Sequence, residues 1–462
     1  MRSNLLSATL LGTAVGAMAG PIQNFTMAQC EAMMNGHLPY TVPRGFNFSG
    51  NVRRYYVAAE IEQWDYAPTG WDNWLGVPMN QSFRAQTWGY IPSEENAGTV
   101  FDKALFRGYT DSSFTVKTEQ PPWQGFEGPT LRAEVNDMIE ILFVNKMDHF
   151  YASMHSMGLY YTKESEGSEY YNGTAYPTEG DGVPPGGCFV YKWLVPEGDL
   201  PNTGYPSKLY SYHSYVSMYQ DQDAGLSGPV IVYNQGMMDS VMSSYREFIV
   251  MYGDNQESNS FLALQNVMKY LPSQADNVAN LTYEYPAITS KGNESIWYPQ
   301  LINDYKKNVT STMLPNFFPM NGYIYANNPP FEMCQYDNVM WYLWDMGFDT
   351  HVAHWHGNNV VWNGQSSSIV PLNPGQSTTV TMNPLSWGWW HLLCHFNTHL
   401  AKGMESIYRV WPVESCPLAP LKPLTTATST MPMTALPTAT EHGNSCQNET
   451  GSKGKKPVTV HF

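Results

Sequence analysis

The chain has 462 residues, with 24 Lys and Arg against 40 Asp and Glu, and a net charge of −16. This acidic balance repels nucleic-acid phosphate, so we expect no nucleic-acid partner. Charged residues make up only 14% of the chain and aromatic residues another 14%, with 37 Gly and 33 Pro. Such a composition favours β-sandwiches joined by long loops over coiled coils, helical repeats or disorder.

The N-terminus has the pattern of a secretory signal peptide over residues 1–19. Arg2 supplies a positive charge, residues 5–17 are mostly apolar, and the AMA at residues 17–19 is a small-residue cleavage site. The alternative, a buried N-terminal helix, is disfavoured by this length and these flanks. No later run reaches the roughly 18 apolar residues of a membrane-spanning helix, so the sequence predicts a secreted, extracellular protein.

Glycosylation sequons agree with export. Eight Asn residues lie in N-x-S/T: Asn24, Asn47, Asn80, Asn172, Asn280, Asn293, Asn308 and Asn448. An exported chain enters an oxidising compartment, where disulfide bonds form. Six Cys residues are available for pairing or for metal binding: Cys30, Cys188, Cys334, Cys394, Cys416 and Cys446.

After a polar leader at residues 20–51, short apolar runs alternate with Gly, Pro and Asn turns, a pattern typical of β-strands. Strands are expected at residues 55–64, 131–145, 227–234, 246–253, 337–347, 377–384 and 405–412. From Cys416 onward the composition changes. The Thr/Pro-rich stretch 425–440 predicts a disordered tail over residues 417–462.

The strand segments form a diverged internal repeat. MIEILFVNKM followed by HSMG resembles NVMWYLWDMG followed by HWHGN, and GLSGPVIVY resembles the later SIYRVWP. A repeat of this length indicates two copies of one structural unit. We therefore predict two all-β sandwich domains, at residues 52–240 and 241–416.

Two C-terminal clusters carry the strongest chemical signal, HVAHWHG from His351 and CHFNTHLAKGM from Cys394. One Cys, two His and one Met are the ligands of a type 1 copper site, where a thiolate and two imidazoles form a plane and a thioether is the long axial ligand. We assign Cys394, His351 and His399 to the plane and Met404 to the axis. The alternatives are unrelated buried side chains, or zinc, for which Met is not a ligand.

Longer segments resemble a known family. VRRYYVAAEIEQWDYAPTG, GPTLRAEVND, AGLSGPVIVY, MNGYIYAN and the two copper-binding segments are similar to multicopper oxidases, in particular the ceruloplasmin and hephaestin type and the A domains of coagulation factors V and VIII. The resemblance covers residues 52–416. It implies an all-β fold of two cupredoxin-like Greek-key β-sandwich domains, the second of which carries type 1 copper.

The resemblance also implies one disulfide, between Cys334 and Cys416. The family partner of Cys188 would lie where this chain has Tyr233. Pairing of Cys188 with Cys30 or with Cys446 therefore stays open at this point.

In this family, type 1 copper passes electrons to a three-copper cluster that is held by four H-x-H motifs. The resemblance implies five surviving ligands here: His155, His213, His354, His356 and His395. Three further ligand positions hold other residues: Met157, Tyr215 and Leu393. His391 lies one strand pleat away and is not expected to replace Leu393. A remodelled single-copper site and a merely polar interface are both compatible with these residues.

The family's iron site is also altered. The matching positions hold Met313, Phe318 and Thr398, which offer none of the hard oxygen donors that Fe(II) needs. Asp337 and Asp349 are near in sequence, but the sequence does not place them at the copper. Fe(II) is therefore not expected to be the natural substrate.

The sequence thus predicts a secreted copper-binding oxidoreductase that oxidises a small organic substrate by one electron, with Cys394 and His399 as its catalytic residues. Its partner would be that organic donor or a redox protein, and the oligomeric state is not predicted. The alternatives are an electron-transfer protein without oxidase activity, a ceruloplasmin-like ferroxidase and a non-catalytic A-domain-like module. Three Trp residues either line an apolar approach to His399 or fill a strand core, the commoner role: Trp387, Trp389 and Trp390.

Overall fold

The computed structural model describes residues 25–168, 180–196, 204–217, 219–278 and 309–424. The predicted signal peptide and most of the predicted tail lie outside these residues. Six of the eight sequons do so as well: Asn24, Asn172, Asn280, Asn293, Asn308 and Asn448. Asn47 and Asn80 are described, and both are exposed.

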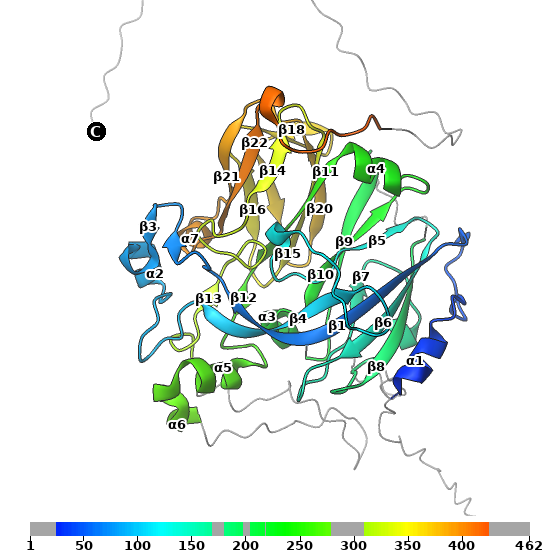
Figure 1. Ribbon diagram of the computed structural model, residues 1–462, viewed down its shortest axis with the longest axis horizontal. Coiled ribbons are helices and arrows are strands. Elements are labelled where there is room, and N and C mark those ends of the chain that lie inside the picture. The colour runs from blue at the N-terminus through cyan, green and yellow to red at the C-terminus, as the bar shows by residue number, and fades with distance from the viewer. Residues whose placement is uncertain (1–24, 169–179, 197–203, 218, 279–308, 425–462) are drawn as a thin grey trace, which may run out of the picture. The chain divides into compact units, whose positions relative to one another are not determined.

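Two β-sandwiches contain most of the strands (Figure 1). The strands of the first are β1 (Val52–Asp65), β4 (Val100–Tyr109), β5 (Leu131–Glu134), β6 (Met138–Asn145), β7 (His155–Met157), β8 (Cys188–Leu194), β9 (Ser207–His213) and β10 (Ser227–Tyr233). They form two four-stranded sheets, in the orders β4-β1-β6-β8 and β5-β10-β9-β7. Apolar side chains from both sheets share one core, among them Val57, Phe106, Phe143 and Val230.

The second sandwich has two five-stranded sheets. Its strands are β11 (Arg246–Gly253), β14 (Phe331–Cys334), β15 (Val339–Met346), β16 (His351–Trp355), β17 (Val360–Trp362), β18 (Gln365–Ser367), β19 (Ile369–Leu372), β20 (Ser377–Met382), β21 (Gly388–Cys394) and β22 (Glu405–Trp411). The sheet orders are β11-β15-β20-β17-β18 and β14-β22-β21-β16-β19.

The predicted internal repeat is visible in the strand pairing. In the first sandwich β1 runs parallel to β6, and β6 runs antiparallel to β8. In the second, β11 runs parallel to β15, and β15 runs antiparallel to β20. The other two sheets match in the same way, because β5-β10-β9-β7 and β14-β22-β21-β16 have the same strand directions. The prediction of two β-sandwiches of one design is therefore confirmed.

The predicted strands are confirmed as well, with one refinement. The apolar run 131–145 is broken into β5 and β6 by a turn at residues 135–137, where Asn136 has φ 71°. Every residue of β6 and of β15 is buried. Such continuous burial is expected of central strands that are covered on both faces.

Short helices and two small strand pairs lie outside the sheets of the sandwiches. The helices are α1 (Met27–Met33), α2 (Phe83–Thr87), α3 (Tyr219–Ala224), α4 (Met238–Ser244), α5 (Ala263–Tyr270), α6 (Ala275–Val278) and α7 (Asn397–Ala401). The strand pairs are β2 (Trp71–Asp72) with β3 (Val77–Pro78), and β12 (Asn255–Gln256) with β13 (Asn316–Phe317). The sequence did not predict α1, which lies in the polar leader and is capped by Thr26. The predicted domain boundary at residue 240 falls within α4 and stays a prediction.

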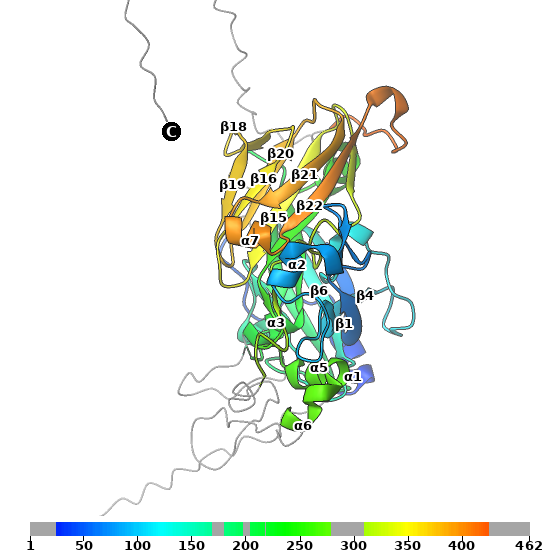
Figure 2. The same ribbon diagram turned by 90° about the vertical axis from the view of Figure 1, so that its left-hand side faces the viewer.

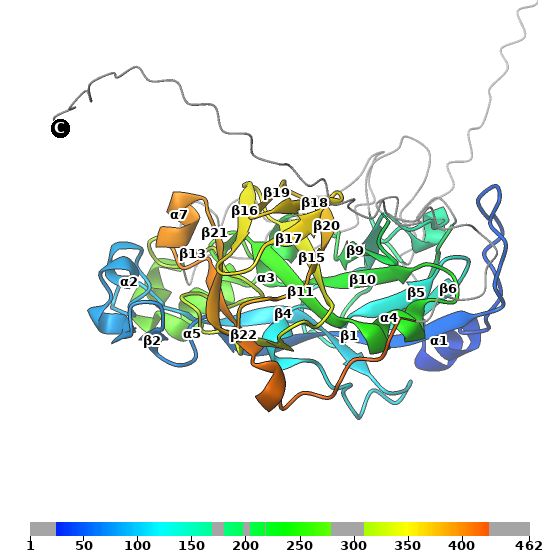
Figure 3. The same cartoon turned by 90° about the horizontal axis from the view of Figure 1, so that it is seen from above.

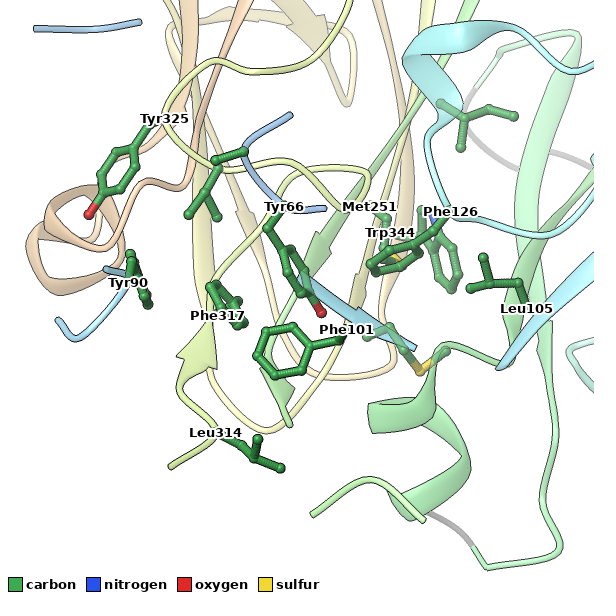
Figure 4. Close-up of a cluster of buried hydrophobic side chains, with 14 of the residues drawn as sticks. Tyr66, Tyr90, Phe101, Leu105, Phe126, Met251, Leu314, Phe317, Tyr325 and Trp344 are labelled. Carbon is green, nitrogen blue, oxygen red and sulfur yellow. The ribbon is translucent and has the colours of Figure 1, made fainter. Parts of the chain in front are cut away.

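The two sandwiches contact each other through β9 on one side and β15 and β20 on the other (Figure 3). Ser377 Oγ donates a hydrogen bond to the carbonyl of Leu209 at 2.6 Å, and the hydroxyls of Ser207 and Tyr342 lie 2.7 Å apart. An apolar cluster continues this contact (Figure 4). In it the rings of Tyr66 and Phe317 stack with centroids 4.0 Å apart.

Two disulfides join described residues. Cys334 is bonded to Cys416, the pair that the family resemblance implied. Cys30 of α1 is bonded to Cys188 at the start of β8. Among the described cysteines only Cys394 is free, which leaves its sulfur available to a metal ion.

Candidate metal centre

One turn of the second sandwich carries three of the four predicted copper ligands. Cys394 is the last residue of β21, His399 lies in α7, and Met404 immediately precedes β22. Figure 2 shows α7 at the end of these strands, beside α2. Main-chain hydrogen bonds close the turn, from Cys394 N to the Met404 carbonyl and from Met404 N to the His399 carbonyl, both at 3.0 Å.

The fourth predicted ligand, His351, lies on the neighbouring strand. His351 opens β16, which pairs antiparallel with β21 so that Ala353 lies opposite Cys394. The N–H of Val352 donates a hydrogen bond to Cys394 Sγ at 3.4 Å. The pairing of β16 with β21 therefore holds the Cys394 sulfur next to the imidazole of His351.

The three planar donors form a nearly regular triangle. Cys394 Sγ lies 3.8 Å from the Nδ1 atoms of both His351 and His399, and these nitrogens are 3.1 Å apart. The point equidistant from the three atoms lies about 2.1 Å from each, close to the roughly 2.0–2.3 Å of metal–nitrogen and metal–sulfur bonds in proteins. The donors therefore fit one metal ion. Met404 is fully buried in the same core cluster as Cys394.

Burial sets the protonation of these ligands in the metal-free protein. It lowers the pKa of His351 to about 3, and it lowers the pKa of His399 as well, so both imidazoles are neutral and offer lone pairs. Burial also raises the pKa of the Cys394 thiol to about 11. A metal ion that binds here replaces the thiol proton, as thiolate ligation requires.

Carboxylates contact the outer nitrogens of both imidazoles. Asp349 Oδ2 lies 3.2 Å from His399 Nε2. On the other ring, His351 Nε2 lies 3.6 Å from one oxygen of Asp254 and 3.6 Å from one of Asp345. The sequence did not identify Asp254 or Asp345. The only signal for Asp345 was a carboxylate inside the apolar run VMWYLWDM.

The positions predicted around the iron site are dispersed. Phe318 stacks on His399, with ring centroids 4.3 Å apart. Met313 packs against the cluster that contains Tyr66, and Thr398 is exposed. Asp337 accepts a hydrogen bond from Arg246 at 3.0 Å and is not at the copper ligands.

The positions predicted for the three-copper cluster lie in two sets, one in each sandwich. In the first sandwich the rings of His155, His213 and Tyr215 have pairwise centroid distances of 5.4 Å. In the second, the ring of His354 lies 5.1 Å from His356 and 5.5 Å from His395. Among the described residues, no grouping of three or more His, Cys, Asp or Glu donors combines the two sets.

Side chains that replaced the missing ligands fill their positions without metal. Leu393 is buried, and Met157 Sδ accepts a hydrogen bond from Ser211 Oγ at 3.6 Å. His391 stacks on Trp74 with centroids 3.6 Å apart, and its ring lies 5.5 Å from His356. The sequence therefore underestimated how near His391 comes to the surviving imidazoles.

The Trp residues of β21 lie by this second set rather than by His399. Trp389 and Trp390 line a cavity of about 230 Å³ together with His356 and His391. Arg409 lies over the ring of Trp389, 4.6 Å from its centroid. The structure thus gives no support to an apolar approach to His399 through these residues.

Comparison with known proteins agrees with this architecture. Residues 123–236 match the family model of multicopper oxidases. Hephaestin from Homo sapiens is 31% identical over 381 residues, which are 80% of this chain and 30% of hephaestin. Ferroxidase HEPHL1 from Homo sapiens is 30% identical over 367 residues (78% of this chain, 29% of that protein), and ceruloplasmin from Ovis aries is 30% identical over 371 residues (78% and 32%). The chain therefore carries a multicopper oxidase domain at residues 123–236.

The chain spans about a third of the length of these curated relatives. Among solved structures, the multicopper oxidase mgLAC aligns with a TM-score of 0.47 and 15% identity, over 80% of this chain and 88% of that one. A copper nitrite reductase from Nitrosomonas europaea aligns with a TM-score of 0.46 and 13% identity, over 78% and 94%. Within the described residues, the helices are all too short or too polar to span a membrane.

Proposed function

We propose that this protein is a secreted copper oxidoreductase that takes single electrons from a small organic donor at one type 1 copper. The observation that carries the proposal is the buried triangle of His351, Cys394 and His399, whose donor atoms share a centre about 2.1 Å away. A thiolate, two imidazoles and a thioether are the donor set of that copper type, and Met404 lies in the same buried cluster as Cys394. Secretion is supported by the signal-like N-terminus, the sequons and the two disulfides.

When bound, copper supplies a one-electron acceptor at this site. The chain's own residues supply the route to it, because His399 joins the copper position to Asp349, whose side chain is 39% exposed. The exposed rings of Phe348 and Phe396 flank this route. A small aromatic donor would pack against those rings.

Asp349 is suited to receive the proton that a phenol releases when it loses an electron. Although partial burial opposes it, the N–H of Thr350 and the His399 ring lower the pKa of Asp349, so that it is a carboxylate at neutral pH. One oxygen faces His399 Nε2, and the side chain is open to solvent at the same time. Donor oxidation and proton acceptance would thus occur at adjacent atoms.

The proposal stops at one-electron oxidation and does not include rapid reduction of oxygen to water. That reaction needs a complete cluster, whereas Met157, Tyr215 and Leu393 occupy three ligand positions. Their surroundings are satisfied without metal, as the packing of Leu393 and Met157 illustrates. We expect steady oxygen uptake with a good organic donor to be slow or absent.

A second candidate is oxidation of Fe(II), which one observation favours. Asp349 is a hard oxygen donor 3.2 Å from His399 Nε2, and it is partly exposed. One of the relatives is named as a ferroxidase. Against this candidate, the His399 ring is covered by Phe318, and the positions of Met313 and Thr398 offer no carboxylate beside it.

The test is metal analysis and electron paramagnetic resonance (EPR) on the secreted protein, followed by anaerobic reduction with phenols, aromatic amines and Fe(II). We expect about one copper per chain with a type 1 signal. Organic donors should bleach the copper faster than Fe(II). Fast, saturable bleaching by Fe(II) would favour the second candidate, and a chain that folds but binds no copper would overturn both and leave a non-catalytic module.

A further inference from the structure

We infer that the protein has a second metal site, in which Asp254, Asp345 and the outer nitrogen of His351 bind a divalent first-row cation of the Zn²⁺ class. His351 would then bridge two metal ions, copper through Nδ1 and the second cation through Nε2. This site goes beyond the proposed function, which uses only the inner nitrogen of that ring.

The main chain brings the three side chains together. Asp345 is in β15, and Asp254 directly follows β11, the parallel neighbour of β15. The N–H of Asp254 donates to the Met346 carbonyl at 3.2 Å, and the N–H of Asp345 donates to the Gln376 carbonyl at 3.0 Å. A Cβ at Gly347 would lie 2.4 Å from an oxygen of Asp254, so this carboxylate needs a glycine beside it.

The distances from His351 Nε2 to the two carboxylates fit a shared metal ion better than they fit hydrogen bonds. His351 Nε2 lies 3.6 Å from an oxygen of each carboxylate, longer than the roughly 2.7–3.2 Å of an N–H···O bond. Two ligands that each lie about 2.0–2.1 Å from one tetrahedral or trigonal ion are separated by about 3.3–3.6 Å. The three donor atoms all lie within 4.8 Å of one another.

The donor atoms are buried and lack other partners. Among the described residues, none offers a hydrogen bond to Asp254 Oδ1, to either oxygen of Asp345 or to His351 Nε2. All three side chains are fully buried. Two unpaired carboxylates in such a place are strongly unfavourable, and a cation that binds both removes the penalty.

Nearby positive charge does not replace the cation. The ammonium of Lys402 is directed over the rings of Trp88 and Phe318, at 4.7 and 4.3 Å from their centroids. The other oxygen of Asp254 already accepts hydrogen bonds from the N–H groups of Phe348 and Asp349, at 3.0 and 2.7 Å. This leaves Oδ1 of Asp254 for the metal ion.

An imidazole nitrogen and two carboxylates suit zinc, with a fourth position left for an oxygen ligand. A cavity of about 310 Å³ borders Asp254 and residues 346–348, on one side of the three donors. Zinc binding at Nε2 releases the Nε2 proton to solvent, so the bridging ring becomes an imidazolate.

The experiment adds Zn²⁺ to the copper-loaded protein and counts both metals after desalting. We expect one zinc per chain in addition to copper, with a shift of the copper EPR signal when zinc binds. Asp345→Asn and Asp254→Asn should weaken zinc binding at least a hundredfold and abolish the shift. Asp349→Asn, which changes the carboxylate on the other imidazole, is the matched control and should leave zinc binding unchanged.

Zinc absent from the wild type, or retained by both Asn variants, would overturn the inference. Asp345→Asn keeps the size of a buried side chain whose oxygens have no hydrogen-bond partner among the described residues, so the metal-free variant should unfold at about the same temperature as the wild type. If it fails to fold, Asp254→Asn decides, because its amide oxygen still accepts from Phe348 and Asp349. Copper content and EPR in the same samples report on the proposed function separately.

Discussion

The two sandwiches share one frame, yet among the described residues only the second has the Cys, His and Met predicted for type 1 copper at its closing turn. In the first, Ser214 N donates to the Leu226 carbonyl and Leu226 N donates to the Asp221 carbonyl. In the second, Cys394, Met404 and His399 make the same two hydrogen bonds. Ser214, Asp221 and Leu226 therefore stand where the second sandwich has Cys394, His399 and Met404.

The matching turn in the first sandwich is held by hydrogen bonds to Asp221. Asp221 Oδ2 accepts from Ser214 Oγ at 2.7 Å and from Val216 N at 2.8 Å, and Oδ1 accepts from Ser217 Oγ at 2.7 Å. Ser153 N donates to Ser214 Oγ, as Val352 N donates to Cys394 Sγ. The fold thus forms the same turn twice, and a few side chains decide whether the turn presents candidate metal donors or a polar network.

The largest effect is expected from Cys394→Ser, which gives the second sandwich the Ser of the first. Copper should fall from about one per chain to nearly none, and the blue or green colour should vanish, because a hydroxyl does not replace the thiolate. Visible absorption and copper analysis measure this, while circular dichroism checks that the fold persists. A coloured Cys394→Ser protein would show that the ligand assignment is wrong.

The reverse test removes the polar network with Asp221→Ala. Asp221 accepts four hydrogen bonds, and in the variant their buried donors would lose this acceptor. The free energy of unfolding should therefore fall by about 3–5 kcal/mol. Urea denaturation measures the loss. The control, Asp239→Ala on the exposed side of α4, should change stability by less than about 1 kcal/mol.

Acid should destabilise the first sandwich more than the second, because of His213. His213 lies opposite Ser227 in the first sandwich, at the position where Leu393 lies opposite Glu405 in the second. Burial lowers the pKa of His213 to about 4, so between pH 6.5 and 4 the unfolded state binds more protons than the folded one. The free energy of unfolding should therefore decrease as the pH is lowered from 6.5 to 4, with a contribution of about 2–4 kcal/mol from this residue.

Urea unfolding of the wild type and of His213→Gln at pH 7 and 4.5 measures the contribution of His213 to the pH dependence of stability. The variant should lose much of the pH dependence, whereas His395→Gln, at an exposed position, should keep it. Equal pH dependence in all three proteins would contradict the role of His213.

The smallest effect concerns electron entry at Asp349. Asp349→Asn should slow anaerobic bleaching by phenols about tenfold, because the amide cannot accept the phenol proton. Donors that release no proton should react at nearly the wild-type rate. Stopped-flow absorption measures both rates, and equal slowing of the two donor types would assign Asp349 a merely structural role.

Much of the candidate site could be predicted because its ligands are local. Cys394, His399 and Met404 lie on one turn of 11 residues, so their spacing survives in the sequence. The strands were predictable because apolar alternation and turn residues report burial directly. Asp254 and Asp345 were missed because they approach His351 only through the parallel pairing of β11 and β15. Sequence patterns carry no signal for such a contact.

Other features needed tertiary packing as well. The pairing of Cys30 with Cys188 was one of two open choices, since spacing alone does not determine connectivity. Helix α1 has 7 residues in a polar segment, too short to show an apolar face. The approach of His391 to His356 depends on how β21 packs against the turn after β16. The alternation of side chains along one strand carries no information about this packing.

The bond between Cys30 and Cys188 closes a loop of 158 residues around most of the first sandwich. A closed loop of this size restricts the unfolded chain by an amount that models put at about 5 kcal/mol. It also keeps the sandwich in one covalent piece after a single backbone cleavage inside the loop. A single cut at the exposed turn of residues 111–113 would leave both fragments covalently joined, and they would separate on a gel only after reduction.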